Sequence, residues 1–276
     1  MKIYTDPYLL QDFLRTSKKA GKTIGFVPTM GFLHDGHASL MAHARAQCDI
    51  LVVSIYVNPL QFSPNEDLDS YPRNPQNDEQ ICAQQSVDII FRPETLYDHN
   101  HATFIRVERL STGLCGGSRP THFEGVCTVV ARLFGFIQPD IAVFGEKDFQ
   151  QLAIIRQLVR DLAMPITIIA APLIRDTDGV ALSSRNKYLS PEQRKKAQSI
   201  SRTLFHIQQE VNTGNTNIHT LRKLARNQLQ VDELDYLDFV DPLQLTPVKD
   251  IVEPTQLLIA AWVGKTRLID NIRLTP

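Results

Sequence analysis

The feature that most constrains the fold is an alternation of buried-strand and helix patterns over the first two-thirds of the chain. Asp49–Val57 is a nearly continuous apolar, β-branched run, typical of a strand buried on both faces of a parallel sheet. His37–Gln47, just before it, has the apolar spacing of a helix. Further strands are predicted at 23–28, 87–92, 141–144 and 166–170, and further helices at 123–137 and 149–162. This alternation predicts an α/β fold with a Rossmann-like, doubly wound parallel sheet, which binds ligands at the carboxyl ends of its strands.

The pattern changes after about residue 172. Ser190 is followed by proline and glutamate, which predicts a helix start. Two amphipathic helices are expected, separated near residues 213–215, and strand-like alternation follows at 235–240, 256–263 and 265–271. We therefore expect a domain covering residues 1–172 and a smaller α+β C-terminal domain, residues 173–276, of helices and a small antiparallel sheet.

Composition excludes several classes of protein. The 276 residues are 43% hydrophobic with a formal net charge of -1, and no local basic patch predicts a nucleic-acid partner. The four cysteines lack metal-site spacing; Cys48 and Cys127 fall in apolar helical patterns and are expected to be buried free thiols. No apolar run approaches the roughly 20 residues of a membrane span, and residues 1–20 carry no secretory leader pattern. We expect a soluble, cytoplasmic protein with no membrane partner.

The most informative motif is Pro28–His37, between the first strand and first helix of the alternating region. Such a junction presents backbone N–H groups and the positive helix end to an anion. Gly31 and Gly36 leave room for phosphate, and His34 and His37 share a face if a helix begins near His34. An isolated pair of this spacing is more often ordinary surface or core, but this position favours phosphate binding. Zinc binding is disfavoured, because the H-E-x-x-H arrangement is absent.

Two further segments suit phosphate. Gly145–Asp148 directly follows a predicted strand, so Lys147 would face the same crevice, although a solvated loop is equally compatible. Leu182–Arg185 places two hydroxyls before an arginine that can engage two phosphate oxygens, although an interdomain loop alone would explain it. Together with Pro28–His37, these segments favour an ATP-using enzyme over a binding module.

The loop at residues 58–73 follows the buried strand and contains three prolines. A stiffened polar loop at the carboxyl end of a strand suits a small polar substrate, with the amides of Asn58 and Gln61 as specificity groups. A plain surface loop fits the composition nearly as well.

The combined motifs resemble those of the pantothenate synthetase (pantoate–β-alanine ligase) family, in order and over essentially the whole chain. They read P-T-M-G-x-L-H-x-G-H, N-P-x-Q-F, G-E-K-D and L-S-S-R-N. The first is similar to the H-I-G-H signature of nucleotidyltransferases and class I aminoacyl-tRNA synthetases. The resemblance implies that pantoate attacks the α-phosphate of ATP to give pantoyl-adenylate and pyrophosphate, and that the amine of β-alanine then displaces AMP.

The resemblance also implies roles for individual residues. ATP binding falls to Met30, Gly31, Phe32, Leu33, His34, Asp35, Gly36, His37, Gly145, Glu146, Lys147, Asp148, Ile174, Leu182, Ser183, Ser184 and Arg185. The catalytic set among them is His34, His37, Lys147, Ser183, Ser184 and Arg185, with His37 as candidate acid. Gln61, Gln151 and Asn58 correspond to the pantoate and β-alanine site. Residues 182–185 would close over the triphosphate with the C-terminal domain acting as a lid.

Magnesium is expected with ATP, because the β- and γ-phosphates need a hard cation. Some family members carry adjacent aspartates where this chain has Asn77 and Asp78, so Asp78 alone is a candidate ligand and the phosphates are expected to hold most of the ion. The family is typically homodimeric, so we expect a homodimer.

Other functions stay open from residues alone. A cytidylyl- or adenylyltransferase would use the same histidine motif, but Gln61 and Gln151 argue against it. A non-catalytic nucleotide-binding protein would give no reason for two histidines, a lysine and an arginine to occur together. An NAD-dependent dehydrogenase is disfavoured, because no G-x-G-x-x-G follows the first strand.

Overall fold

The first part of the chain forms a six-stranded, wholly parallel sheet in the order β1-β4-β3-β2-β5-β6. The computed structural model describes residues 1–64 and 66–276. The strands are β1 (Lys2–Tyr4), β2 (Ile24–Thr29), β3 (Ile50–Ile55), β4 (Ile89–Phe91), β5 (Ile141–Gly145) and β6 (Thr167–Ala171). The predicted fold class is confirmed, and the predicted strands lie within one to three residues of the observed ones at each end.

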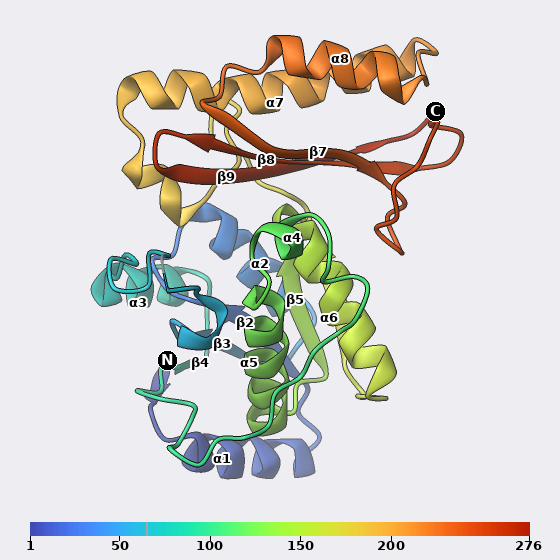
Figure 1. The fold of residues 1–276 in the computed structure, drawn as a ribbon. Helices are drawn as coiled ribbons and strands as arrows, with labels where there is room; N and C mark the ends of the chain where they lie inside the picture. The colour runs from blue at the N-terminus through green and yellow to red at the C-terminus, as the bar shows by residue number, and fades with distance from the viewer. Residues whose placement is uncertain (65) are drawn as a thin grey trace.

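Helices cover both faces of this sheet (Figure 1). They are α1 (Pro7–Lys19), α2 (Asp35–Arg45), α3 (Pro75–Gln84), α4 (Cys115–Ser118), α5 (His122–Ile137) and α6 (Phe149–Asp161). Apolar side chains of α1, α5 and α6 pack on one face, and those of α2 and α3 pack on the other. The short 3-10 segments are η1 (Pro59–Gln61), η2 (Glu146–Asp148) and η3 (Ser184–Tyr188).

The strand order has a reversal next to β2. The chain fills the sheet from β2 through β3 to β4, then returns to the other side of β2 for β5 and β6. Loops leaving β2 and β5 therefore diverge from neighbouring strand ends, which opens a crevice. Both the histidine motif after β2 and Lys147 after β5 lie at this crevice.

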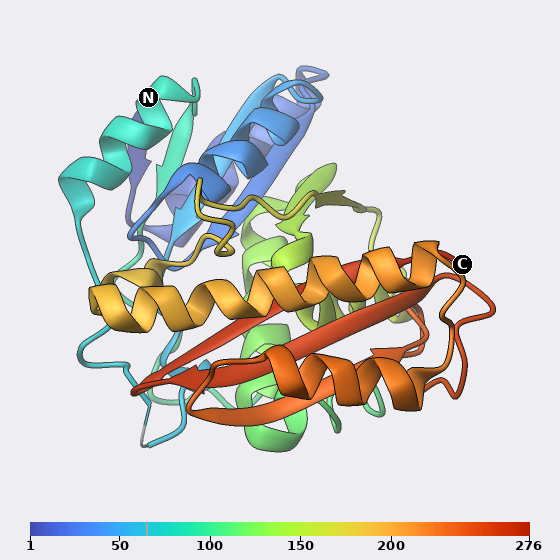
Figure 2. The same ribbon diagram turned by 90° about the horizontal axis from the view of Figure 1, so that it is seen from above.

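The last hundred residues form a second layered unit. The strands β7 (Glu233–Val240), β8 (Thr255–Val263) and β9 (Thr266–Leu274) make an antiparallel sheet. Its core packs against α7 (Pro191–Asn212) and α8 (Ile218–Gln228), which lie side by side across one face (Figures 1 and 2). Ser190 caps α7 reciprocally with Gln193, as the predicted helix start requires. β9 contacts η2, at the edge of the first sheet.

The cysteines are free in the described part of the chain. Cys127 is buried in α5, as predicted. The helical placement of Cys48 is wrong: α2 ends at Arg45, and Cys48 lies half-buried in the turn before β3. Within the residues described, no helix combines the length and apolarity needed to cross a bilayer.

Candidate active site

The crevice beside β2 and β5 contains a cavity of about 240 Å³ that gathers most of the predicted residues. Its predicted lining residues are Met30, His34, Gly36, His37, Asn58, Gln61, Gly145, Lys147, Asp148, Gln151, Ile174, Leu182, Ser183, Ser184 and Arg185. They come from four segments that are separated in sequence, so the predicted motifs meet at a single place in the fold.

Five predicted ATP-binding residues lie outside this lining: Gly31, Phe32, Leu33, Asp35 and Glu146. Leu33 is buried in the core between the sheet and α2, and Asp35 is exposed at the first turn of α2. Gly31 and Phe32 face a different cavity behind the turn. Gly31 has a φ of +84°, and a Cβ there would lie 3.0 Å from Ile55 Cγ2, so this position favours glycine for the backbone rather than for a ligand.

Hydrogen bonds from backbone N–H groups define the tautomers of the two histidines of the motif. His34 is the N-cap of α2, and its Nδ1 accepts from the Gly36 N–H at 3.1 Å. The His34 N–H in turn donates to Nδ1 of His37 at 3.3 Å. An imidazole that accepts at Nδ1 carries its proton on Nε2. Both rings are therefore neutral donors at Nε2.

Burial and electrostatics keep both rings neutral. Burial and the Lys147 ammonium lower the pKa of His34 to about 4. Burial, His34 and Lys147 together lower the pKa of His37 well below its usual range. The ring centroids lie 4.1 Å apart, so a charge on one ring opposes a charge on the other.

Asp78 supports the turn that carries these histidines. Its carboxylate accepts from the N–H groups of Phe32 at 3.0 Å and Leu33 at 2.7 Å, and it is 2% exposed. Burial raises the pKa of this carboxyl group. Both oxygens are thus engaged in holding the turn, which argues against Asp78 as a magnesium ligand. Among the described residues there is also no cluster of three or more metal-ligating side chains.

Lys147 lies in η2, where the C-terminal sheet touches the first domain. Asn271 of β9 donates from Nδ2 to the backbone carbonyls of Glu146 at 2.9 Å and Lys147 at 3.0 Å. Gln256 donates to Asn271 Oδ1 at 2.7 Å and thereby fixes the orientation of that amide. The backbone of the lysine is therefore held from the opposite domain.

Asn58 and Gln61 have different geometries. Asn58 is buried, and its amide bonds to Gly125 O, Gln61 Oε1 and the Tyr97 hydroxyl, so it positions the loop. Among the described residues, the Gln61 side-chain N–H₂ donates only to the Met30 sulfur, a weak acceptor, which leaves it available to a ligand. Gln151 lies in the first turn of α6 and lines the same cavity.

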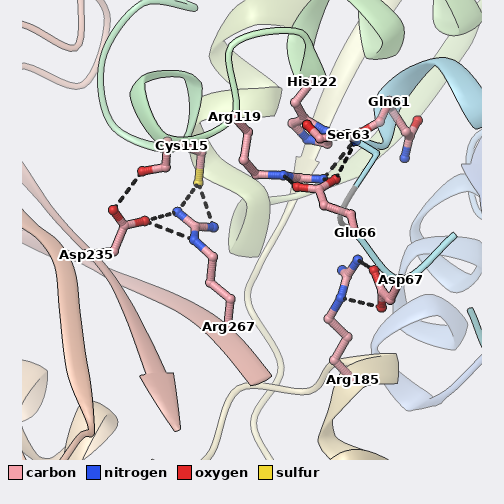
Figure 3. A network of polar contacts seen from close by, with 11 residues as sticks. Gln61, Ser63, Glu66, Asp67, Cys115, Arg119, His122, Arg185, Asp235 and Arg267 are labelled. Atoms are coloured by element: carbon pink, nitrogen blue, oxygen red, sulfur yellow. Dashed lines mark hydrogen bonds and ion pairs between the residues drawn. The ribbon is translucent and has the colours of Figure 1, made fainter. Parts of the chain in front are cut away.

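The serine and arginine segment is docked against the 58–73 loop. Ser183 accepts from the N–H of Arg185, and the Ser184 hydroxyl lies 3.1 Å from the Tyr71 hydroxyl. Arg185 binds both carboxylate oxygens of Asp67, at 3.1 and 2.8 Å (Figure 3). The cationic group predicted to clamp phosphate is therefore paired with a carboxylate in this structure.

Sequence reasoning missed a second polar network beside the cavity (Figure 3). Arg119 binds Glu66 through two nitrogens, at 2.5 and 2.8 Å, and also reaches the carbonyl of Gln61 at 3.3 Å. His122 Nδ1 lies 2.9 Å from that same carbonyl. These partners are more than 50 positions apart in sequence, so no local spacing pattern could reveal them.

A third network joins the two domains. Arg267 of β9 pairs with Asp235 at 2.6 Å, and Asp235 accepts from Ser118 at 2.7 Å. The Cys115 sulfur contacts the Arg267 guanidinium at 3.5 Å (Figure 3). It also lies 3.1 Å from the Tyr236 hydroxyl. A separate cavity of about 100 Å³ lies here and shares Arg119, His122 and Lys147 with the larger one.

Comparison with known proteins gives one consistent family. The family model described as Pantoate-beta-alanine ligase matches residues 2–273. The chain is 47% identical to pantothenate synthetase of Desulfatibacillum aliphaticivorans, covering all of both chains. It is 48% identical to pantothenate synthetase 1 of Bradyrhizobium diazoefficiens, covering all of this chain and 99% of the relative.

Solved structures agree over the full length. Pantothenate synthetase of Thermus thermophilus superimposes with a TM-score of 0.94 at 41% identity, covering both chains completely. The Francisella tularensis pantoate-beta-alanine ligase, in complex with beta-gamma ATP and beta-alanine, gives a TM-score of 0.79 at 34% identity, covering 99% of this chain and 97% of that one. With the histidine motif, Lys147 and Arg185 lining one crevice of this fold, the chain belongs to the pantoate–β-alanine ligase family.

Proposed function

We propose that this chain catalyses the ATP-dependent condensation of pantoate with β-alanine to pantothenate, a precursor of coenzyme A, through a pantoyl-adenylate intermediate. Family membership over residues 2–273 supports the reaction, and the ATP and β-alanine bound to the Francisella tularensis relative support the substrates. The observation that carries the assignment in this chain is the pair of neutral histidines with Nε2 as donor, beside Lys147 in the main cavity.

The first half-reaction needs donors where phosphate charge develops. His34 and His37 can donate Nε2–H to phosphate oxygens without carrying a charge of their own. Lys147 supplies the positive charge, and its backbone is fixed by Asn271. The reaction requires no enzyme nucleophile, because the pantoate carboxylate attacks the α-phosphorus directly and pyrophosphate departs. Catalysis then consists of alignment and charge stabilisation.

Pantoate is proposed to lie against Gln61 and Gln151, two amides that line the cavity. Asn58 is proposed to position Gln61 without contacting pantoate itself, because its amide is engaged by Gly125, Gln61 and Tyr97. Ser183, Ser184 and Arg185 are proposed to turn from the 58–73 loop to the triphosphate. Residues 173–276 act as the lid that carries them.

Magnesium enters as part of the Mg·ATP substrate. Asp78 is occupied by two backbone N–H groups, so the phosphates and water are proposed as its ligands. A homodimeric state and a cytoplasmic location, where ATP is available, are further predictions.

The test is pyrophosphate release from Mg·ATP with pantoate, with and without β-alanine. We expect sustained turnover to AMP and pantothenate only with both substrates. The absence of pantoate-dependent pyrophosphate release, with ATP still bound, would contradict the proposal.

A further inference from the structure

Three histidines line the main cavity, and their hydrogen bonds divide them into two kinds. His34 and His37 accept backbone N–H groups at Nδ1, so each presents a proton at Nε2. His122 lies 2.9 Å through Nδ1 from a backbone carbonyl, that of Gln61. A carbonyl can only accept, so Nδ1 of His122 holds the proton and Nε2 holds a lone pair.

The lone pair of His122 remains available. Among the hydrogen bonds of the described residues, none involves Nε2 of His122. This nitrogen is also not one of the unpaired polar atoms that are completely buried, so it is not sealed off from the cavity. The ring lines both the main cavity and the smaller one beside Arg267. Arg119 donates to the same Gln61 carbonyl at 3.3 Å, so two side chains hold this acceptor in place.

The second half-reaction creates a need for such an acceptor. The uncharged amine of β-alanine, having lost its first proton to solvent, attacks the acyl carbon of the adenylate. The C–N bond forms and the nitrogen becomes positive and acidic. The C–O bond to AMP then breaks, its electron pair leaving on the phosphate, and the nitrogen must lose one proton to become an amide.

Other acceptors beside the cavities are occupied. Glu66 is bound by Arg119 and Asp67 by Arg185, each through two nitrogens. Asp270 is bound by Arg175. Asp148 lies 3.7 Å from the Lys147 ammonium and is 47% exposed, which makes it the remaining alternative among the carboxylates that the structure describes beside the cavities.

We propose that Nε2 of His122 accepts the proton lost by the attacking β-alanine nitrogen as pantothenate forms, which assigns a catalytic role to a residue outside the nucleotidyltransferase motifs. The proton then passes to solvent. Burial and the Arg119 guanidinium lower the pKa of His122 to about 4, so the ring is neutral and able to accept at physiological pH. This role rests on the proposed ligase function and concerns only its second step.

The test separates the two half-reactions in His122→Asn. The asparagine amide can still donate to the Gln61 carbonyl in place of Nδ1–H, but it has no group at the position of Nε2. The first step is measured by pantoate-dependent exchange of labelled pyrophosphate into ATP without β-alanine. The second is measured by rapid quench of preformed pantoyl-adenylate mixed with β-alanine. Asp148→Asn is the comparison variant for the alternative acceptor.

We expect His122→Asn to keep the exchange rate within about threefold and to slow amide formation by roughly 10²-fold or more, the usual range for general-base catalysis. Loss of both steps to the same extent would show that His122 only shapes the site and would overturn the proposal. A slow second step in Asp148→Asn with a normal one in His122→Asn would move the role to Asp148. Failure of exchange in the wild-type protein would instead contradict the ligase function itself.

A measurement without mutation checks the basis of the proposal. Nitrogen-15 NMR of histidine-labelled protein distinguishes a protonated Nδ1 from a protonated Nε2. His122 is expected to be protonated at Nδ1, and His34 and His37 at Nε2. Finding the proton of His122 on Nε2 would overturn the assignment even if the variant failed to fold.

Discussion

At the scale of single residues, the site depends on groups kept in their uncharged or unpaired form. His34 and His122 have pKa values lowered to about 4, mainly by burial. Removal of charged imidazole from water is unfavourable, so the folded protein binds fewer protons than the unfolded chain in mildly acidic solution. Neutral histidines suit hydrogen-bond donation to phosphate and proton acceptance, and keeping them neutral therefore lowers the stability of the folded protein at low pH.

This gives a pH prediction with a definite sign. An unfolded histidine titrates near 6.5, so as the pH falls from 6.5 towards 4 the unfolded chain gains protons that folded His122 does not. The free energy of unfolding should fall over that window by about 2–3 kcal/mol for this group. Urea denaturation at pH 7 and pH 4.5 measures it. His122→Asn should reduce the pH dependence.

Lys147 is the residue whose removal should cost most in the adenylation step. Lys147→Ala removes the positive charge beside both histidines, and we expect kcat to fall by roughly 10²-fold or more. Steady-state assays with saturating substrates measure this, with exposed Lys223→Ala as the control. Turnover close to the wild-type value in Lys147→Ala would mean that another group neutralises the phosphate.

At the scale of elements, the sequence predicts the helices and strands whose buried side chains form a pattern within the local sequence. Strands β2 to β6 of the parallel sheet appear as short apolar runs because they are covered on both faces, and each of these five was located closely. The short edge strand β1 is mostly exposed and was not predicted. α1 was not predicted, although Asp6 caps it and Pro7 stands at its first position. An aspartate followed by proline is a helix-start signal that the sequence contains. α3 is polar, with only Asp78 and Cys82 buried, so it offers little periodicity to read.

The site was predictable only where local motifs carry it. The loops after β2 and β5 and the 182–185 segment were placed together correctly, because strand ends of a parallel sheet share one edge. The roles of Arg119, His122 and Asn271 depend on partners 58, 61 and about 125 positions away. Spacing along one sequence contains no record of such contacts.

Asn271 tests whether the antiparallel sheet takes part in catalysis. Asn271→Ala removes both hydrogen bonds to the η2 backbone, and a small displacement of Lys147 is enough to disturb phosphate alignment. We expect kcat to fall about tenfold, with the KM for ATP changed by less than about threefold. Arg273→Ala, exposed on the same strand, is the control. Equal rises in KM for both substrates would show a general loosening instead.

At the scale of the whole molecule, the two domains meet through charged and polar groups as well as β9. Arg185 and Ser184 bind Asp67 and Tyr71 of the first domain, while Cys115 and Ser118 contact Tyr236 and Asp235 of the second. The first set includes residues proposed to hold triphosphate. If ATP binds Arg185 as proposed, it competes with Asp67 for this side chain, and the proposed closure of the lid over nucleotide would exchange one ion pair for another.

Asp67→Asn tests this competition. The amide keeps the size of the side chain but removes the charge that binds Arg185 through two nitrogens, with both side chains about three-quarters buried. If Arg185 must leave Asp67 in order to bind ATP, loss of the ion pair should tighten ATP binding about three- to tenfold, because less interaction energy is given up on binding. Isothermal titration with Mg·ATP measures the Kd, and exposed Asp69→Asn is the control. Weaker ATP binding would instead show that Asp67 organises the 58–73 loop for the nucleotide, and that the domain contact assembles the site before ATP arrives.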